Sequence, residues 1–586
     1  MKKIIYILCV FWGFALTSCN EEEWLKETPL DFFAPENSYE TSAHFQKSLN
    51  YIYDLIRWWN FRYNDETGGF QHHLYIGSDM YYHGHPNNID DNLNNYGAWI
   101  IPDRNHVNRN WSNFFNGVSS ANVILTKLET NASKVTAADK QRFRGEALFF
   151  RAYYYSRLAH IWGDVPIITE MITEPRNDFT RDPRDKVYEQ CQIDLLEAIS
   201  LLDNIDKVPD GTVSKQVAQH LLSEVYICRK DYSKAIEAAN AVVNYPGVGL
   251  MTERFGTYKD DPTKDVFFDL FRQNQTNRKS GNTEGLFVIQ YDWQNASPYL
   301  CIRARYLMPQ LRTAMTLKEG GTDINNPAHR TPAVPNFSME NGGRGNGYFP
   351  TTYYFRQIIW QSDFDNDIRN SACNIFRDYI VDNAGTKNAA GQWTMEPAAG
   401  HGQWLIKDGW LYEPDTFSYI YPQVTKLCAF EGIPSVAFEM SGGVQALTDI
   451  GNHKLLNSND YAVGSFKDEY LIRLAETYLL LAEAYVLNNQ LQQAADAINV
   501  VRSRAKASPA TAEQMNIDYI LDERARELAG EEVRNVTLFR MGKMVERARK
   551  YGPAGHKVLD HQNLYPIPYA EIEKNIGAVL TQNPGY

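Results

Sequence analysis

The sequence lacks any apolar run long enough to span a membrane. The apolar run at its start, Ile4–Leu16, has thirteen residues, whereas a transmembrane helix needs about 20. A short apolar run behind the charged residues Lys2 and Lys3 is typical of a secretory leader. We therefore expect residues 1–18 to be removed on export and the rest of the chain to be soluble.

Cysteine is also scarce, with seven in 586 residues. Cys9 lies in the leader, and Cys19 directly follows it. The others form an odd number without the spacing of a metal site: Cys191, Cys228, Cys301, Cys373 and Cys428. Two disulfides remain an alternative in an exported protein, but buried thiols are the expectation.

The motifs of common enzymes are missing too. The sequence contains no nucleophile elbow, Walker loop or zinc-protease helix motif. One histidine-rich stretch offers metal ligands, but glycine interrupts it and metal binding would need a strand there: His72, His73, Asp79, His83 and His85. We expect no metal, no cofactor and no enzymatic activity. A net charge of −13 further argues against nucleic acid as a partner.

Aromatic residues, by contrast, are abundant. The chain has 36 Tyr, 28 Phe and 12 Trp, together 13% of its residues. Tyr and Trp combine a flat apolar face with a polar group, which suits hydrated binding surfaces as well as cores. The composition is therefore compatible with both a large core and a binding surface.

Two distant segments repeat one pattern. Val217–Val243 and Thr477–Val501 align on Tyr226 and Tyr485, with leucine four residues before and alanine nine residues after each tyrosine. This spacing matches the tetratricopeptide helix–turn–helix. A single repeat cannot bury its apolar face, so further helical pairs must stack beside these. We predict a mainly α fold with a tetratricopeptide-like scaffold of helical hairpins.

Further helices are predicted where apolar residues recur at helical spacing. They are Ala43–Trp59, Asn108–Leu128, Ala137–Ile161, Arg184–Leu202, Asp518–Leu528 and Asn535–Tyr551. Between residues 245 and 465 helical periodicity fades, and glycine, proline, asparagine and aromatic residues dominate. The predicted division is therefore a leader (1–18), a tether (19–41), an N-terminal helical scaffold (42–244), a loop-rich insertion with short strands that forms a ligand-binding lobe (245–465), and a C-terminal helical scaffold (466–586).

Four stretches carry a further pattern in a fixed order. They are WLKETP (Trp24–Pro29), RGEALFFRAYYYSRLAHIWGDVPII (Arg144–Ile168), EYLIRLAETYLLLAEAY (Glu469–Tyr485) with INVVRSRA (Ile498–Ala505), and ERARELAGEEVRNVTLFRMGK (Glu523–Lys543) with LYPIPYAEIEKN (Leu564–Asn575). Together they resemble the SusD/RagB family of outer-membrane nutrient-binding lipoproteins. One departure is Glu531-Glu532, where the family more often has Glu-Gly.

The charged residues of these motifs predict structure rather than chemistry. Arg144, Glu146, Arg151 and Asp164 lie among aromatic residues, and the segment 523–534 is rich in both signs of charge. A buried charge without a partner costs several kcal/mol. We therefore expect ion pairs between helices here, and a ligand site elsewhere.

The residues around Cys19 predict a lipid anchor. Leu16-Thr17-Ser18-Cys19 resembles the bacterial lipobox, in which the thiol takes up diacylglycerol and the new amino terminus is acylated. Several acyl chains hold a protein stably in a membrane, whereas one does not. The following Asn20-Glu21-Glu22-Glu23 is either a solvated acidic tether or, as it resembles the export signal of Bacteroidetes lipoproteins, a signal for the outer face of the outer membrane.

The family resemblance implies a protein that binds oligosaccharides, or in some cases peptides, at the cell surface and caps a TonB-dependent transporter of the SusC type. We predict that this chain binds an oligo- or polysaccharide and delivers it to such a β-barrel. Two alternatives are a RagB-like protein that captures peptides, and a structural lid of the transporter without ligand affinity of its own.

The resemblance also implies that ligand contacts come from two stretches, Tyr75–Trp99 and about Tyr291–Trp360. Aromatic rings stack on the CH faces of sugars, and Asn, Asp and Arg bond to their hydroxyl groups. The candidates of these types are Asp79, Tyr81, Tyr82, Asn87, Asn88, Trp99, Trp293, Tyr299, Arg305, Tyr353, Tyr354 and Trp360.

Overall fold

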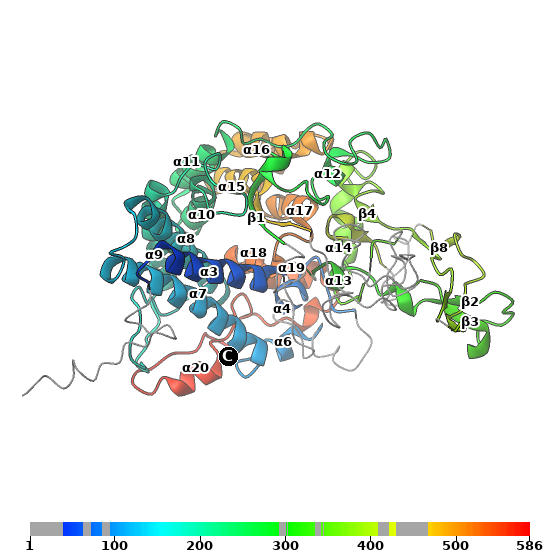
Figure 1. Cartoon of the computed structure of the whole chain (residues 1–586), viewed down its shortest axis with the longest axis horizontal. Coiled ribbons are helices and arrows are strands. Elements are labelled where there is room, and N and C mark those ends of the chain that lie inside the picture. Colours follow the sequence, from blue (N-terminus) through cyan, green and yellow to red (C-terminus); the bar gives the residue numbers. More distant parts are fainter. Residues whose placement is uncertain are drawn as a thin grey trace, which may run out of the picture.

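The computed structural model describes residues 39–61, 72–84, 94–291, 301, 303–334, 341–343, 345–388, 390–407, 421–428 and 467–586. Long helices gather on one side of the molecule, and a lobe of short strands and turns extends from the other (Figure 1). The leader, Cys19 and the acidic tether lie outside these residues. Within them, no helix is long and apolar enough to cross a membrane.

The helical side confirms the predicted mainly α scaffold. Its helices are α3 (Ser42–Phe61), α4 (His72–Tyr75), α6 (Tyr96–Trp99), α7 (Asn105–Thr130), α8 (Ala137–Trp162), α9 (Arg184–Leu201), α10 (Lys215–Cys228), α11 (Tyr232–Val243), α15 (Leu474–Leu487), α16 (Leu491–Arg504), α17 (Ile517–Leu528), α18 (Arg534–Arg540), α19 (Met544–Tyr551) and α20 (Tyr569–Lys574). Helices α7 to α11 stack in order, and α15 packs against α11, so the two predicted hairpins lie side by side.

The two hairpins share one turn geometry. In each, the residue four positions after the aligned tyrosine has a positive φ: 63° at Lys230 and 57° at Asn489. The next amide donates back to the carbonyl of that tyrosine, over 3.0 Å to Tyr226 and 2.8 Å to Tyr485. Such a bond across a left-handed residue ends a helix sharply. The repeat read from side chains is therefore also a repeat of backbone conformation.

The predicted helix Asn535–Tyr551 is two helices, α18 and α19. Gly542 has a φ of 65°. Its amide donates to Phe539 O over 3.1 Å, and the Lys543 amide donates to Leu538 O over 2.8 Å. These two bonds form a Schellman turn, which depends on the left-handed glycine. Apolar spacing continues across the break and could not reveal it.

The lobe consists of paired short strands and single-turn helices. The pairs are β2 (Met315–Leu317) with β3 (Arg330–Pro332), β4 (Ile375–Phe376) with β9 (Gln423–Val424), β5 (Tyr379–Ile380) with β8 (Trp404–Ile406), and β6 (Thr386–Lys387) with β7 (Trp393–Met395), all antiparallel. The helices are α12 (Val266–Asp269), α13 (Arg303–Leu307) and α14 (Tyr353–Arg356). β1 (Gly285–Ile289) pairs instead with β10 (Glu469–Arg473), which leads directly into α15.

Buried ion pairs join the lobe to the helical side. Arg369 of the lobe bonds to Glu523 over 2.8 Å and to Glu527 over 2.9 Å, both on α17. Burial alone would raise the pKa of the Glu527 carboxyl, but Arg504, Arg473 and Arg369 together hold that pKa well below its usual range. The predicted charge network between helices is confirmed, and it extends into the lobe.

The α8 motif also pairs its charges as predicted. Arg151 makes a two-pronged ion pair with Asp194 of α9, over 2.8 and 2.7 Å. Glu146 accepts hydrogen bonds from Tyr53 and Arg142. Each of these bonds crosses between helices or spans one turn of α8, so the motif holds the scaffold together. All five cysteines beyond Cys19 are free thiols. Three of them are buried as expected (Cys191, Cys301 and Cys428), whereas Cys228 and Cys373 are partly exposed.

Buried histidines predict a stability that falls in mild acid. Burial lowers the pKa of His106, His160 and His220, because the charged imidazolium would lose its hydration. Below about pH 6.5 the unfolded chain binds protons that the folded chain does not, so the free energy of unfolding falls by up to about 1.4 kcal/mol per pH unit for each histidine. Urea unfolding between neutral pH and about pH 5.5 measures this slope. His160→Gln should make the slope shallower, and an unchanged slope would contradict the assignment.

Candidate functional site

The two stretches predicted to bind ligand lie side by side in the structure. The Tyr82 amide donates to Pro350 O over 3.2 Å, the Gly84 amide to Tyr348 O over 3.2 Å, and the Thr352 amide to Met80 O over 2.8 Å. Residues 80–84 and 348–352 therefore form a short antiparallel contact between the N-terminal scaffold and the lobe.

Gly84 makes this close approach feasible. A Cβ atom at residue 84 would lie 2.1 Å from Pro350 Cγ, far inside van der Waals contact. Any other residue would push the two segments apart. The glycine that interrupts the histidine-rich stretch thus has a structural reason, which is to let residues 80–84 and 348–352 touch.

A third segment joins the same place. The Asn94 side chain accepts from the His83 amide and donates to the His83 carbonyl, both over 2.8 Å. Helix α6 follows and ends at Trp99. The Trp99 ring stacks on His106 at 5.1 Å between centroids, and the Arg104 guanidinium lies 4.8 Å from its centroid. Trp99 remains partly exposed in this arrangement.

We call the four exposed or partly exposed aromatic residues of these three segments, Tyr82, Trp99, Tyr348 and Tyr353, the loop junction. Tyr82, Trp99 and Tyr348 are partly exposed, and Tyr353 is 57% exposed although the next residue of α14 is buried. Such rings offer apolar faces to a ligand. Three of these four residues are sequence candidates, and Tyr348 is an addition.

Four other candidates belong to the core, and this corrects the sequence prediction for them. Asp79, Tyr81, Tyr354 and Trp360 are each at most 1% exposed. The Trp360 indole donates to Phe355 O over 2.7 Å. These side chains pack where the lobe meets the helical side, so they position the loop junction rather than contact a ligand.

The contacts of Asp79 explain why the sequence alone assigned it wrongly to the ligand site. Its carboxylate bonds to Arg534 over 2.9 and 2.7 Å and to Arg547 over 2.9 Å. Burial would raise the pKa of Asp79, but these two arginines hold it below its usual value. Both partners lie more than 450 positions away in the chain, so no local pattern could indicate the pairing.

The remaining candidates are outside the described part of the chain. They are Asn87, Asn88, Trp293 and Tyr299, together with the side chain of Arg305. Their role as ligand contacts therefore stays a prediction. Of the histidine-rich stretch, His83 is buried, and no group of three His, Cys, Asp or Glu among the described residues is placed to hold a metal ion.

Two exposed tryptophans of the lobe are absent from the ligand-contact candidates named from the sequence. Trp393 on β7 is 45% exposed and Trp404 on β8 is 56% exposed. The Lys387 ammonium lies 4.3 Å from the Trp393 ring centroid. Tryptophans between glycines and prolines in a stretch without helical periodicity were a usable signal, but they lie beyond Trp360, where the predicted ligand stretch ended.

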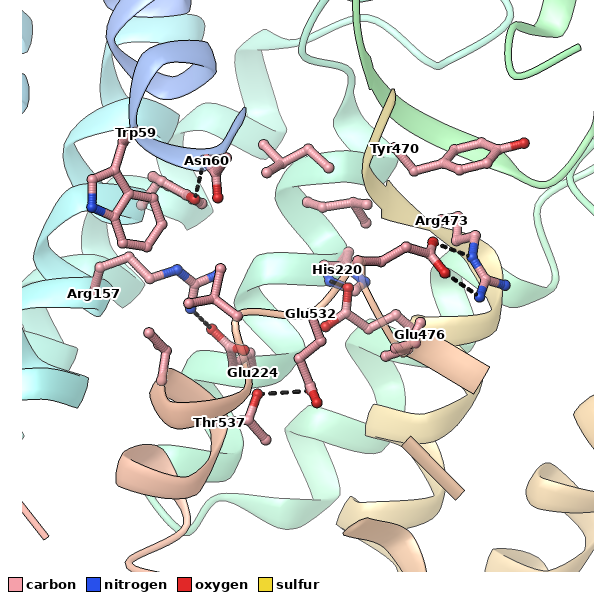
Figure 2. A pocket seen from close by; sticks show the side chains of 17 residues that line it. Trp59, Asn60, Arg157, His220, Glu224, Tyr470, Arg473, Glu476, Glu532 and Thr537 are labelled. Carbon is pink, nitrogen blue, oxygen red and sulfur yellow. Dashed lines mark hydrogen bonds and ion pairs between the residues drawn. The ribbon is translucent and has the colours of Figure 1, made fainter. Parts of the chain in front are cut away.

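An internal cavity of about 70 Å³ lies where α8, α10, α18 and β10 meet. Figure 2 shows that its polar side chains point toward one another. Arg157 donates to Glu224 over 2.8 Å, and the Thr537 hydroxyl donates to Glu532 over 2.8 Å. Arg157 and Arg540 hold the pKa of Glu224 low despite its burial. The cavity has room for a few water molecules but not for a sugar ring. We assign it to the ionic core of the scaffold.

Comparison with known proteins places the fold. A family model described as "SusD family" matches residues 331–586, and one described as "Starch-binding associating with outer membrane" matches residues 34–227. A SusD-like protein of Formosa agariphila is 21% identical over 98% of this chain and 97% of its own length. A second from the same organism is 27% identical over 50% of this chain and 54% of its own length.

Solved structures share the fold over nearly the whole chain. A laminarin-binding SusD-like protein is 22% identical with a TM-score of 0.62, covering 94% of this chain and 100% of the other. Surface glycan-binding protein A from Bacteroides thetaiotaomicron, solved with laminarihexaose, is 19% identical with a TM-score of 0.62, covering 93% and 99%. Both of these proteins are described by what they bind. The two family models match residues 34–227 and 331–586, which together make up most of the chain. This chain belongs to the SusD family.

Proposed function

We propose that this protein binds a neutral oligo- or polysaccharide at the cell surface through the loop junction. The observation that carries the proposal is the contact of residues 80–84 with Asn94 and with residues 348–352, because each of these three segments carries or leads into an aromatic residue that is at least partly exposed. Solved proteins of the same fold are described as binding laminarin or laminarihexaose. Stacking on aromatic faces suits a ligand that is rich in CH groups and carries no charge.

The proposal includes delivery to a SusC-like TonB-dependent transporter. The lobe of residues 245–465 would carry half of the ligand surface, and the helical scaffold would hold it over the β-barrel. Co-purification from detergent-solubilised membranes tests this step. A tagged form of this chain should retain a large β-barrel protein, and its recovery without that barrel at every detergent tried would contradict the partnership.

Titration calorimetry with a panel of neutral polysaccharides, including laminarin and starch, tests the ligand class. Saturable binding to one of them with a favourable enthalpy is expected. Binding to peptides and to none of the polysaccharides would establish the peptide-capturing alternative. If the protein bound neither polysaccharides nor peptides but still co-purified with the transporter, only the alternative of a structural lid would remain.

We further propose that lipid on Cys19 holds the protein on the outer surface of the outer membrane. Cys19→Ala removes the thiol that accepts diacylglycerol, so the protein should move from the membrane fraction to the soluble fraction. Cys228→Ala is the matched control, because Cys228 is a free thiol within α10, and it should leave the protein in the membrane. Protease added to intact cells should degrade the wild type, and full protection would place it on the periplasmic face.

A further inference from the structure

A second hollow lies on the helical side, along helix α3. It has a volume of about 720 Å³, within the roughly 300–1,000 Å³ of small-molecule sites. Its lining comes from α3, the start of α8, residues 203–212 and the end of β1. We call it the α3 groove. It shares no lining residue with the loop junction.

Gly211 sets one wall of the α3 groove. Its φ is +78°, and a Cβ atom there would lie 2.6 Å from Gln290 Cγ and 3.2 Å from Val288 O. The loop before α10 can therefore press against the end of β1 only with glycine at this position. The wall is a built feature of the fold, since two segments 77 positions apart meet there without a side chain between them.

Most of the charges that line the α3 groove already have partners inside the protein. Arg57 pairs with Asp54, one turn before it on α3. Arg142 bonds to Glu146 over 3.0 Å, and Lys207 bonds to its neighbour Asp206. The lining has three acidic side chains and three basic ones, so it carries no net charge: Asp54, Glu146, Asp203, Arg57, Arg142 and Lys207. An ionic ligand of either sign would therefore meet like charges in the lining. The groove therefore favours a neutral ligand.

Amide groups in the α3 groove offer hydrogen bonds to such a ligand. The Asn50 Oδ1 atom accepts from Gln46 Nε2 over 2.8 Å, and the Asn50 Nδ2 donor has no partner within the part of the chain that the structure describes. Gln290 Nε2 donates to Asn277 Oδ1 over 2.7 Å, which leaves Gln290 Oε1 as an acceptor. The donor on α3 and the acceptor at the end of β1 can each bond to a hydroxyl group, which both donates and accepts.

Apolar groups complete the lining. Val208 and Pro209 of the loop contribute CH surface to the lining. We propose that the α3 groove is a second binding site for a neutral, hydroxyl-rich ligand, one or a few sugar units of the same class as the ligand of the loop junction. The identity of the ligand class rests on the proposed function; the existence of the groove and its charge balance do not.

Hydrogen–deuterium exchange of the full chain with millimolar neutral hexasaccharides tests the proposal, with laminarihexaose, maltohexaose, cellohexaose and xylohexaose as probes. One of these sugars should slow exchange in residues 203–213. Asn50→Trp, which fills the groove from an exposed position on α3, should abolish that protection and leave protection of residues 80–84 intact. Gln492→Trp, an exposed amide on α16, is the matched control and should change neither.

The outcomes separate this proposal from the function of the loop junction. Protection of residues 203–213 that survives Tyr353→Ala but not Asn50→Trp supports an independent site, even if residues 80–84 show no protection. Protection of residues 80–84 alone would overturn the α3 groove as a site and leave the loop junction standing. No protection of either segment with any of the sugars would overturn both.

Discussion

Replacing Asp79 with alanine is expected to destabilise the protein by about 3–5 kcal/mol, because it removes the buried carboxylate that two buried arginines share. Asp79 is fully buried between Arg534 and Arg547. Arg547 also bonds to Asp522 of α17 over 2.7 Å, so the loss would spread through the contact between α17 and α19. Urea unfolding at neutral pH, followed by circular dichroism, measures the change.

An exposed ion pair provides the control for this experiment. Arg176 and Asp178 bond over 2.9 Å, but both side chains are at least half exposed. Asp178→Ala should leave the unfolding midpoint unchanged, since pairs in water contribute little. If Asp79→Ala kept wild-type stability and instead lost ligand affinity, Asp79 would be a binding residue and the correction made from its burial would be wrong.

The second large effect concerns the exposed rings of the loop junction. Tyr353→Ala should weaken binding of the polysaccharide about tenfold, and adding Trp99→Ala about a hundredfold, because a ring at the centre of a contact surface contributes about 1.4 kcal/mol or more. Tyr353 is 57% exposed, so the single variant should fold as the wild type does, whereas Trp99 also packs against the core and its removal should lower the melting temperature. Calorimetric titration measures the affinity, and the melting temperature checks the fold.

Tyr569 supplies the matched control for the loop-junction variants. It is 50% exposed, close to the 57% of Tyr353, but lies at the start of α20, which packs against α7. Tyr569→Ala should bind the polysaccharide as the wild type does. Equal losses from Tyr569→Ala and Tyr353→Ala would mean that exposed aromatic residues act non-specifically, and would remove the loop junction as the site.

The helical scaffold was predictable because its signals are local. Apolar spacing located α3, α7, α8 and α9 to within a few residues, and the tyrosine-centred repeat located both hairpins. The ion pairs of the α8 motif were predictable because its charged residues lie among aromatic residues in the sequence. The break at Gly542 was missed because a left-handed turn interrupts the backbone without interrupting the pattern of side chains.

The site was only partly predictable, because burial depends on distant partners. Tyr75–Trp99 and Tyr291–Trp360 were placed together through the family resemblance, and residues 80–84 do touch residues 348–352. Within those stretches, however, Tyr353 is exposed while Tyr354 is buried. One-turn helices and isolated strand pairs have no period long enough to tell such neighbours apart, so the inward-facing residues could not be recognised.

The most direct test of the account is the structure of this protein with its polysaccharide fragment bound, determined by crystallography. The account predicts a sugar ring stacked on at least one aromatic side chain of the loop junction, with the backbone of residues 80–84 and 348–352 unchanged. A fragment bound with full occupancy anywhere else, with Tyr82, Trp99, Tyr348 and Tyr353 all in solvent, would contradict it.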